Sequence, residues 1–396
     1  MKRGFDSMPK SPMLSKAEAE KLKLRMLKAL SINARLSFLD LGKKSGVGKY
    51  VAYKYFPEMV EEYGIKFVPE INVENIWKYE LVKLMAHEST KTGIRENIID
   101  KFPDVIGFEE YMVFVKFISG KPEDEEILKA IGDSYIPQFV AKLIGDYDLV
   151  VYAIARNFEE INKYIVRTFS NLKKTYVTIN TVRITRTFGF FPLRNELIEK
   201  FNISETYRKV LLYLNQDGRR EFADIARLVK IKPEGITYTL DRLEKTGMLE
   251  RISYYETKPR NVVTSIITMK ITNLPLFFEA RDKWLLDMTK VTEEKHVEYS
   301  FMCDIQSPSG VLIFANFETT TAADNFLNSL NKTFKGVELS HMLITKILIG
   351  SLGIRNFDMR YSQQYQILQA KNLVPRFDRK EGKIEERPNY VESEES

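Results

Sequence analysis

The feature that most constrains this chain is an internal repeat with a shift of 184 residues. The stretch 33–47 (NARLSFLDLGKKSGV) aligns with the stretch 217–231 (DGRREFADIARLVKI). The matched positions are Asn33 with Asp217, Arg35 with Arg219, Phe38 with Phe222, Asp40 with Asp224, Leu41 with Ile225, Gly42 with Ala226 and Val47 with Ile231. A repeated stretch predicts a repeated structural unit, so the same fold should occur twice.

Both copies lie between segments with the apolar spacing of amphipathic helices. The apolar positions are Leu24, Leu27, Ala29, Leu30 and Ile32, then Ala52, Phe56 and Met59 in the first copy, and Val210, Leu211 and Leu214, then Ile236, Leu240 and Leu243 in the second. Gly64 and Gly247 follow as candidate left-handed helix ends, and Gly42 and Ala226 suit close helix crossings. With strand-like segments at 65–68 and 248–252, this order predicts two winged helix-turn-helix units.

The first unit is basic: residues 1–66 contain 14 Lys and Arg against 7 Asp and Glu, whereas the whole chain has a net charge of +6. Such an asymmetry indicates a polyanionic partner. The third helix of a winged helix enters the major groove, where lysines neutralise phosphates and tyrosines reach phosphates or base edges. We therefore predict double-stranded DNA as the partner, although units of this kind also serve as protein-interaction modules. The predicted DNA contacts of the first unit are Arg35, Lys49, Tyr50, Tyr53 and Lys54.

The second unit is expected to bind DNA less strongly. Residues 195–260 contain 13 Lys and Arg against 11 Asp and Glu, and Glu234 and Asp241 would weaken phosphate attraction there. Its candidate contacts are Lys232, Thr237, Tyr238 and Arg242. In the first unit, Pro57 should kink or shorten the third helix.

Two further segments have the pattern βαββαβ, which is typical of ferredoxin-like sandwiches. The first has expected strands at 111–117, 139–144, 147–153 and 177–185 and helices at 122–136 and 158–171. The second has expected strands at 264–271, 297–304, 310–317 and 337–349 and helices at 276–289 and 322–334. The sequence therefore predicts an α+β protein in which two winged helix-turn-helix domains alternate with two ferredoxin-like domains.

The expected domain boundaries follow from these patterns. They are a flexible tail at 1–14, winged helices at 15–71 and 193–260, a helical insertion or linker at 72–109, ferredoxin-like domains at 110–192 and 261–350, and a C-terminal extension at 351–396 that is disordered from about residue 371. One chain could then act as its own pseudo-dimer, with the two sandwiches paired sheet to sheet, or assemble into a homo-oligomer. The 66–110 stretch is expected to add one or two helices.

With its Asn33-x-Arg35 winged helix and the stretch Leu143–Leu149 (LIGDYDL), the chain resembles the Lrp/AsnC regulators of transcription over most of residues 15–350. The resemblance implies a DNA-binding regulator whose ferredoxin-like domain senses an amino acid or related small effector. It also implies an effector site at Gly145, Asp146, Tyr147 and Asp148. A Gly-Asp hairpin is equally explained as a structural turn, and the second sandwich has Ser307-Pro308-Ser309-Gly310 at this place.

Other features bear on alternative functions. A single cysteine and three separated histidines (His87, His296 and His341) argue against a disulfide framework and a metal site. No nucleotide-binding glycine loop is present. We therefore expect a cytoplasmic, nucleoid-associated protein without a cofactor, a membrane partner or enzymatic activity.

The alternative is an enzyme, because some proteins with this domain pair resemble siroheme decarboxylases. That chemistry is expected to place histidines near a tetrapyrrole, and His296 and His341 are the candidates. A third alternative is a sensor that acts through protein partners without DNA.

Overall fold

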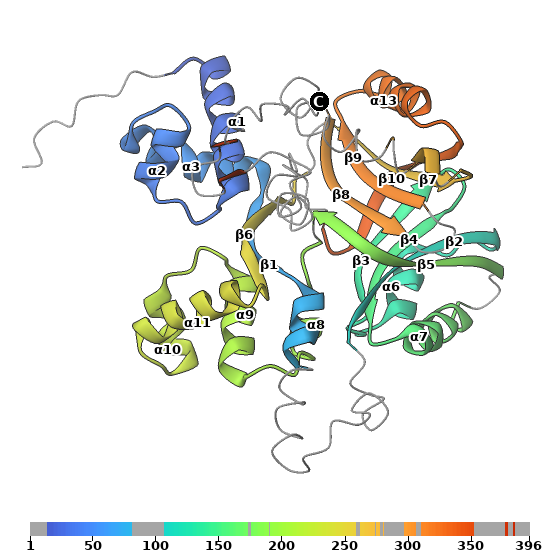
Figure 1. The fold of residues 1–396 in the computed structure, drawn as a ribbon, viewed down its shortest axis with the longest axis horizontal. Coiled ribbons are helices and arrows are strands. Elements are labelled where there is room, and N and C mark those ends of the chain that lie inside the picture. The colour runs from blue at the N-terminus through green and yellow to red at the C-terminus, as the bar shows by residue number, and fades with distance from the viewer. Residues whose placement is uncertain are drawn as a thin grey trace, which may run out of the picture.

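The computed structural model of the 396-residue chain describes residues 14–80, 107–172, 176–189, 191–258, 262–273, 275–277, 280, 297–305 and 310–351, with short strands at 377–378 and 383–384. Two helical units lie on one side of the molecule and a large β structure lies on the other (Figure 1). Among the described residues, no helix has the length and apolar character needed to cross a membrane.

The helical units are the two predicted winged helices. The first contains α1 (Lys16–Ile32), α2 (Phe38–Lys44), α3 (Lys49–Tyr63) and β1 (Ile65–Ile71), and the second contains α9 (Glu205–Gln216), α10 (Phe222–Val229), α11 (Pro233–Lys245) and β6 (Leu249–Glu256). A Cβ at Gly42 would lie 2.9 Å from the carbonyl oxygen of Val47. The backbone of the α2–α3 turn thus approaches Gly42 closely, in agreement with the small residue expected at this crossing.

Of the two effects expected of Pro57, a kink or a shorter third helix, the shorter helix is not found. Helix α3 continues past Pro57 to Tyr63 and ends at Gly64, which has a φ of +60°. The buried residues Tyr55, Met59 and Tyr63 lie on both sides of the proline. Tertiary packing of this face outweighs the loss of one backbone hydrogen bond.

The two wings pair with each other, which makes the winged helices a pseudo-dimer. Strand β1 is antiparallel to β6, with Val68 opposite Ser253 and Pro69 opposite Ile252. The backbone amide of Ala34 donates to Ile252, and Gly218, its counterpart in the repeat, donates to Phe67. Each unit thus contacts the wing of the other in the same way, as expected for two copies related by a pseudo-twofold axis.

The β structure contains both predicted ferredoxin-like domains. The first is β2 (Glu109–Ser119), α6 (Asp124–Ile131), β3 (Pro137–Ile144), β4 (Leu149–Ala155), α7 (Phe158–Ser170) and β5 (Tyr176–Gly189). The described elements of the second are β7 (Val263–Ile271), β8 (Val297–Ile305), β9 (Gly310–Phe317), α13 (Thr320–Thr333) and β10 (Val337–Ile349). Helix α6 is shorter than expected because Gly132 ends it with a φ of +63°. Most of the expected helix at 276–289 lies outside the described residues.

The two sheets join edge to edge rather than pairing only face to face, which corrects the expected packing. The strand order β10-β3-β4-β2-β5-β8-β9-β7 forms a closed barrel. The last strand of each domain pairs with the second strand of the other, as β5 with β8 and β10 with β3. This closure satisfies the backbone groups that a separate sandwich would leave unpaired at its edges.

Alternation along the strands divides the apolar residues between the inside and the outside of the barrel. Outward residues pack under α6 and α7 in the first domain and under α13 in the second. Inward residues of both domains belong to one core, which continues into the winged helices. The barrel end where β2 starts and β5 finishes points toward the winged helices (Figure 1).

The expected insertion and tail are only partly described. Residues 73–80 are helical, as predicted for the start of the insertion, whereas 81–106 lie outside the described residues. The same holds for most of 352–396, where only β11 (Phe377–Asp378) and β12 (Lys383–Ile384) are described.

Candidate functional site

The third helix of the first winged helix presents its predicted face to solvent. Lys49, Tyr50, Tyr53 and Lys54 are all exposed, with 76% of Tyr50 and 61% of Tyr53 accessible. The ring of Tyr53 meets Phe38 edge to face at 5.1 Å, which holds the tyrosine on the α2–α3 surface. The four residues therefore form one accessible basic and aromatic face, which we name the α3 face.

The corresponding face of α11 is also exposed, but its charged groups interact within the helix. Arg242 donates to the hydroxyl of Tyr238 at 3.0 Å, and Lys245 pairs with Asp241 at 2.8 Å. Lys232 and Thr237 are exposed as well. The second copy thus offers less unpaired positive charge than the α3 face, in line with the sequence.

Arg35, expected to contact DNA, lies instead between the two winged helices. Its guanidinium donates to the carbonyl oxygens of Gly218 at 2.6 Å and Arg220 at 3.1 Å, and lies 4.3 Å from the ring centre of Phe222. We therefore remove Arg35 from the predicted DNA contacts.

Arg219 makes the reciprocal contacts. It donates to the carbonyl oxygens of Ala34 and Leu36, and it lies over the rings of Phe38, Phe56 and Phe67. Burial lowers the pKa of both guanidinium groups, and the charge of Arg35 adds to this effect at Arg219. Arg35 and Arg219 form a double clamp that holds the winged helices together.

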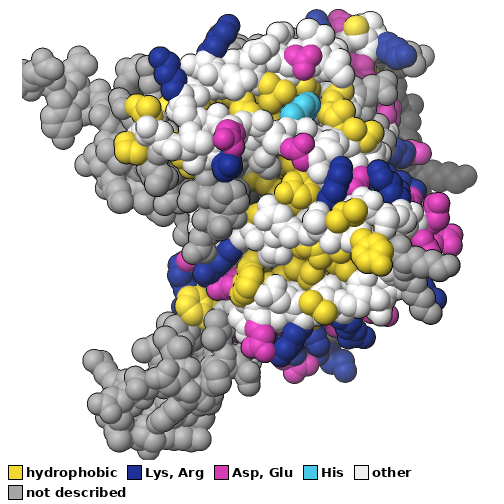
Figure 2. Space-filling model, turned by 90° about the vertical axis from the view of Figure 1, so that its right-hand side faces the viewer, with side chains coloured by type: hydrophobic (Ala, Val, Ile, Leu, Met, Phe, Trp, Pro, Cys, Tyr) yellow, Lys and Arg dark blue, Asp and Glu magenta, His cyan; other side chains and the backbone are white. Residues whose placement is uncertain are grey.

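The turn at 145–148 lies where the two ferredoxin-like domains meet. Gly145 has a φ of +141°, and a Cβ there would lie 2.9 Å from Met342 of the second domain. Asp146 accepts a hydrogen bond from Ser340, and the Tyr147 ring lies 5.2 Å from that of Phe114. This barrel end faces away from the winged helices, and hydrophobic side chains are visible there between charged ones (Figure 2).

Asp148 has structural partners that account for its burial. It accepts hydrogen bonds from the Phe117 amide at 2.9 Å and from Lys121 at 2.8 Å. Burial acts to raise the pKa of Asp148, but these two bonds outweigh it and hold the pKa below its ordinary value. These contacts account for the turn structurally, and an effector site at Gly145, Asp146, Tyr147 and Asp148 stays a prediction.

Of the three histidines, His341 is the one whose position is described. It lies on β10, where its Nε2 is 2.9 Å from the hydroxyl of Ser265, and burial lowers its pKa. Its strand neighbours Val337 and Leu339 pack in the outer core of the second domain. His341 therefore lies on the outer face of the sheet, away from the barrel interior.

A polar group inside the barrel was not predicted from the sequence. Glu110 on β2 accepts a hydrogen bond at 2.9 Å from the hydroxyl of Tyr152 on β4. Burial raises the pKa of Glu110 to about 7; Tyr152 partly opposes this effect, and the negative charge of Glu74 adds to it.

Aromatic rings from both domains surround this pair. Tyr152 stacks on Phe191 with ring centres 4.4 Å apart, and Phe191 meets Phe314 of the second domain at 5.4 Å. Phe139 contacts both phenylalanines, at 5.1 Å from Phe191 and 6.1 Å from Phe314. Asn316 is the next inward residue of β9. We name these residues (Glu110, Phe139, Tyr152, Phe191, Phe314 and Asn316) the barrel-end cluster.

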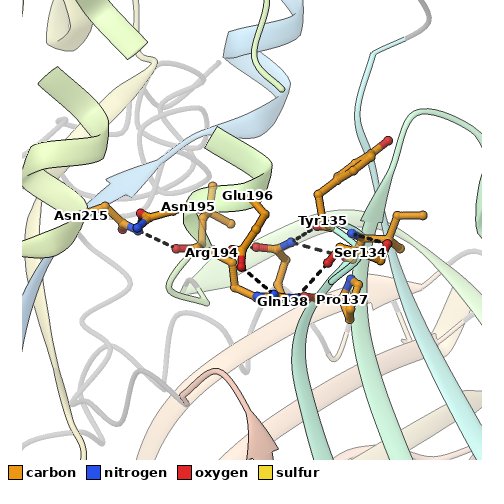
Figure 3. Close-up of polar contacts among 10 residues, drawn as sticks. Ser134, Tyr135, Pro137, Gln138, Arg194, Asn195, Glu196 and Asn215 are labelled. Carbon is orange, nitrogen blue, oxygen red and sulfur yellow. Dashed lines mark hydrogen bonds and ion pairs between the residues drawn. The ribbon is translucent and has the colours of Figure 1, made fainter. Parts of the chain in front are cut away.

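Phe191 belongs to the connection between β5 and the short helix α8 (Asn195–Ile198), which leads into the second winged helix. Arg194 anchors this connection to β3, as Figure 3 shows. Its guanidinium donates to the carbonyl oxygens of Ser134 at 2.9 Å and Pro137 at 3.0 Å, and its amide donates to Gln138 at 2.8 Å. The barrel-end cluster is therefore in direct structural contact with the start of the second winged helix.

Comparisons with known proteins support the fold. No protein-family model matches the chain, and no curated protein matches it. The solved structure of the siroheme decarboxylase NirDL matches with a TM-score of 0.50 and 11% identity, over 88% of this chain and 99% of that one. Two regulator structures match smaller parts. LrpC from B. subtilis matches with a TM-score of 0.28 and 14% identity, over 37% of this chain and 96% of that one. An AsnC family regulator from Agrobacterium tumefaciens matches with a TM-score of 0.27 and 13% identity, over 42% of this chain and 89% of that one.

The near full-length match corrects one expectation from the sequence. We expected no enzymatic activity because nucleotide and metal motifs are missing, yet the structure that shares this architecture from end to end is that of an enzyme. The absence of those motifs therefore does not exclude an enzyme. What the comparison shows is a fold: the chain has the Lrp/AsnC-like pairing of a winged helix with a ferredoxin-like domain, present twice.

Proposed function

We propose that the chain is an enzyme that decarboxylates a carboxylated tetrapyrrole at the barrel-end cluster. The observation that carries the proposal is the Glu110–Tyr152 pair, a titratable acid among aromatic rings from both domains. The arrangement of four domains in one chain, like that of NirDL, supports it.

The reaction needs a proton donor at the substrate carbon. When the bond between a side-chain carbon and its carboxylate breaks, CO2 leaves and the electron pair stays on that carbon. A proton must then be added there, and an acid with a pKa near the working pH is the most effective donor. Glu110 has such a pKa, and Tyr152 orients its carboxyl group. Glu110 then regains its proton from water.

The residues of the cluster suit a flat, carboxylated ligand in two respects. The rings of Phe139, Tyr152 and Phe314 offer surfaces on which a macrocycle can stack. Phe191 comes from a connection rather than a strand, so it can move aside without breaking a strand pair. Arg156 and Lys200 lie at the same end of the barrel, over the rings of Phe108 and Tyr135. His341, on the outer face, is not a candidate for contact with the macrocycle.

The test is direct. Purified protein incubated anaerobically with siroheme is expected to shift the absorbance bands of the tetrapyrrole and to yield a product lighter by one CO2 per decarboxylation, detected by mass spectrometry. A protein that leaves both the spectrum and the mass unchanged would refute the proposal.

A second function, binding of duplex DNA, is favoured by the α3 face. Its lysines and tyrosines are exposed, and phosphate contacts make DNA affinity depend on salt. Changing Lys49 and Lys54 together to alanine should weaken binding and reduce the slope of log affinity against log salt by about 2. Fluorescence anisotropy with a labelled duplex over a salt series measures both quantities.

The matched control removes two lysines far from the α3 face. The Lys129→Ala/Lys163→Ala variant changes the net charge equally on α6 and α7 of the barrel. An equal loss of affinity in both variants would mean that net charge, not the α3 face, attracts DNA.

A further inference from the structure

Asn316 is a buried amide with one unused donor. It lies on β9 with 1% of its surface accessible, and its Oδ1 accepts a hydrogen bond from Thr264 at 2.8 Å. Within the part of the chain that the structure describes, its Nδ2 has no hydrogen-bond partner. Thr264 and Asn316 also face each other across the β7–β9 strand pair.

The unused donor belongs to the barrel-end cluster. Leu312 and Phe314 are inward residues of the central core, and alternation makes Asn316 the next inward residue on the same strand. Phe314 contacts Phe191, which in turn stacks on Tyr152, the partner of Glu110. Asn316 therefore lies on the strand that brings Phe314 of the second domain into the cluster that contains Glu110.

A donor buried in this way reduces the stability of the fold. An unsatisfied buried amide loses its hydrogen bonds to water and gains none in return. A leucine of similar size would fill the same place in the core without this loss. The arrangement is therefore better explained by a partner that arrives from outside than by packing.

We infer that Asn316 is a substrate-binding residue, whose Nδ2 donates to a carboxylate of a tetrapyrrole bound at the barrel-end cluster. This inference rests on the proposed function and names the contact that the second domain makes with the substrate. The first domain supplies the proton through Glu110, and the second domain holds an acid side chain of the substrate through Asn316. The site is then complete only when both ferredoxin-like domains contribute.

The experiment compares Asn316→Leu with the wild type, using uroporphyrin III as the probe in absorbance titrations. We expect the dissociation constant to rise about tenfold or more, because a hydrogen bond to a charged group is lost. Without the ligand, the melting temperature should change little, since the leucine removes the unpaired Nδ2 donor but also the acceptor of the Thr264 hydroxyl. A merely structural asparagine would give the opposite pattern, with a lower melting temperature and unchanged affinity.

Thr264→Val is the matched control. It removes the hydrogen bond to Oδ1 and leaves the Nδ2 donor in place, so the melting temperature should fall while uroporphyrin affinity stays within about twofold of the wild type. Equal affinity of wild type and Asn316→Leu for uroporphyrin overturns the inference alone. Absence of uroporphyrin binding by the wild type overturns it together with tetrapyrrole binding. Weaker binding by Asn316→Leu in a protein that does not decarboxylate siroheme supports the inference and refutes only the reaction.

Discussion

Replacing Glu110 with glutamine is expected to slow siroheme decarboxylation by at least about 100-fold, the usual contribution of a positioned general acid. Glutamine keeps the size of the side chain and can still accept the hydrogen bond from Tyr152. It has no acidic proton, so the side-chain carbon loses its nearest donor. Single-turnover assays by mass spectrometry measure the rate. Siroheme binding by the variant within a few-fold of the wild type would show that the loss concerns proton transfer.

The pH dependence of the decarboxylation rate tests whether Glu110 acts as the acid. Because burial raises the pKa of Glu110 to about 7, the protonated form is lost as the pH rises through 7, and the wild-type rate should fall over the same range. The Glu110→Gln variant should lack this decline. A wild-type rate that increases from pH 6 to pH 8 would contradict the role of Glu110 as the acid.

The same pKa shift predicts a change of stability without substrate. The folded state holds the Glu110 proton more tightly than the unfolded state, so its stabilising effect is complete below the ordinary pKa of 4.5 and is lost as the pH rises through 7. The loss is at most about 3 kcal/mol. In Glu110→Gln the decline of the melting temperature over this range should be smaller than in the control Glu125→Gln, which changes an exposed glutamate of α6.

The sequence was sufficient for the two kinds of domain and their order, because its strongest signals are local. The repeat at 33–47 and 217–231 predicted two copies of one unit, and the βαββαβ order predicted the strands within a few residues. Barrel closure was not predictable from such patterns. It depends on which edge strands meet, as β5 meets β8, and hydrophobic alternation is the same in a sandwich and in a barrel.

The candidate sites also differ in whether the sequence alone could predict them. The α3 face could be predicted, since exposed positions of an amphipathic helix follow from its apolar spacing. Glu110 could not, because it follows Glu109 at the start of a strand, where two carboxylates suggest solvent. Only the tertiary structure places Tyr152 beside it. Arg35 was misassigned although a signal existed: the arginine recurs as Arg219, and a residue kept in both copies also fits a contact across a pseudo-twofold axis.

Arg219→Ala is expected to lower the free energy of unfolding of the winged-helix pair by about 3 kcal/mol. The change leaves the carbonyl oxygens of Ala34 and Leu36 without their donor, at about 1–3 kcal/mol for each buried group. It also removes a cation that lies over three phenylalanine rings. Differential scanning calorimetry measures the effect. The control Arg227→Ala removes an 80% exposed arginine of α10 and should change stability by no more than about 0.5 kcal/mol.

The double variant Arg35→Ala/Arg219→Ala then distinguishes two kinds of interface. The two guanidinium charges lie close enough for Arg35 to lower the pKa of Arg219, so each single change also relieves a repulsion. If each clamp contributes its contacts separately, the double variant should lose more stability than the two single losses combined. The reason is that each single loss is reduced by the relieved repulsion between the two arginines, whereas the double variant gains this relief only once. If removing one clamp already separates the winged helices, the second change adds little. We expect the first result, because the β1–β6 pairing keeps the two units together after either clamp is lost.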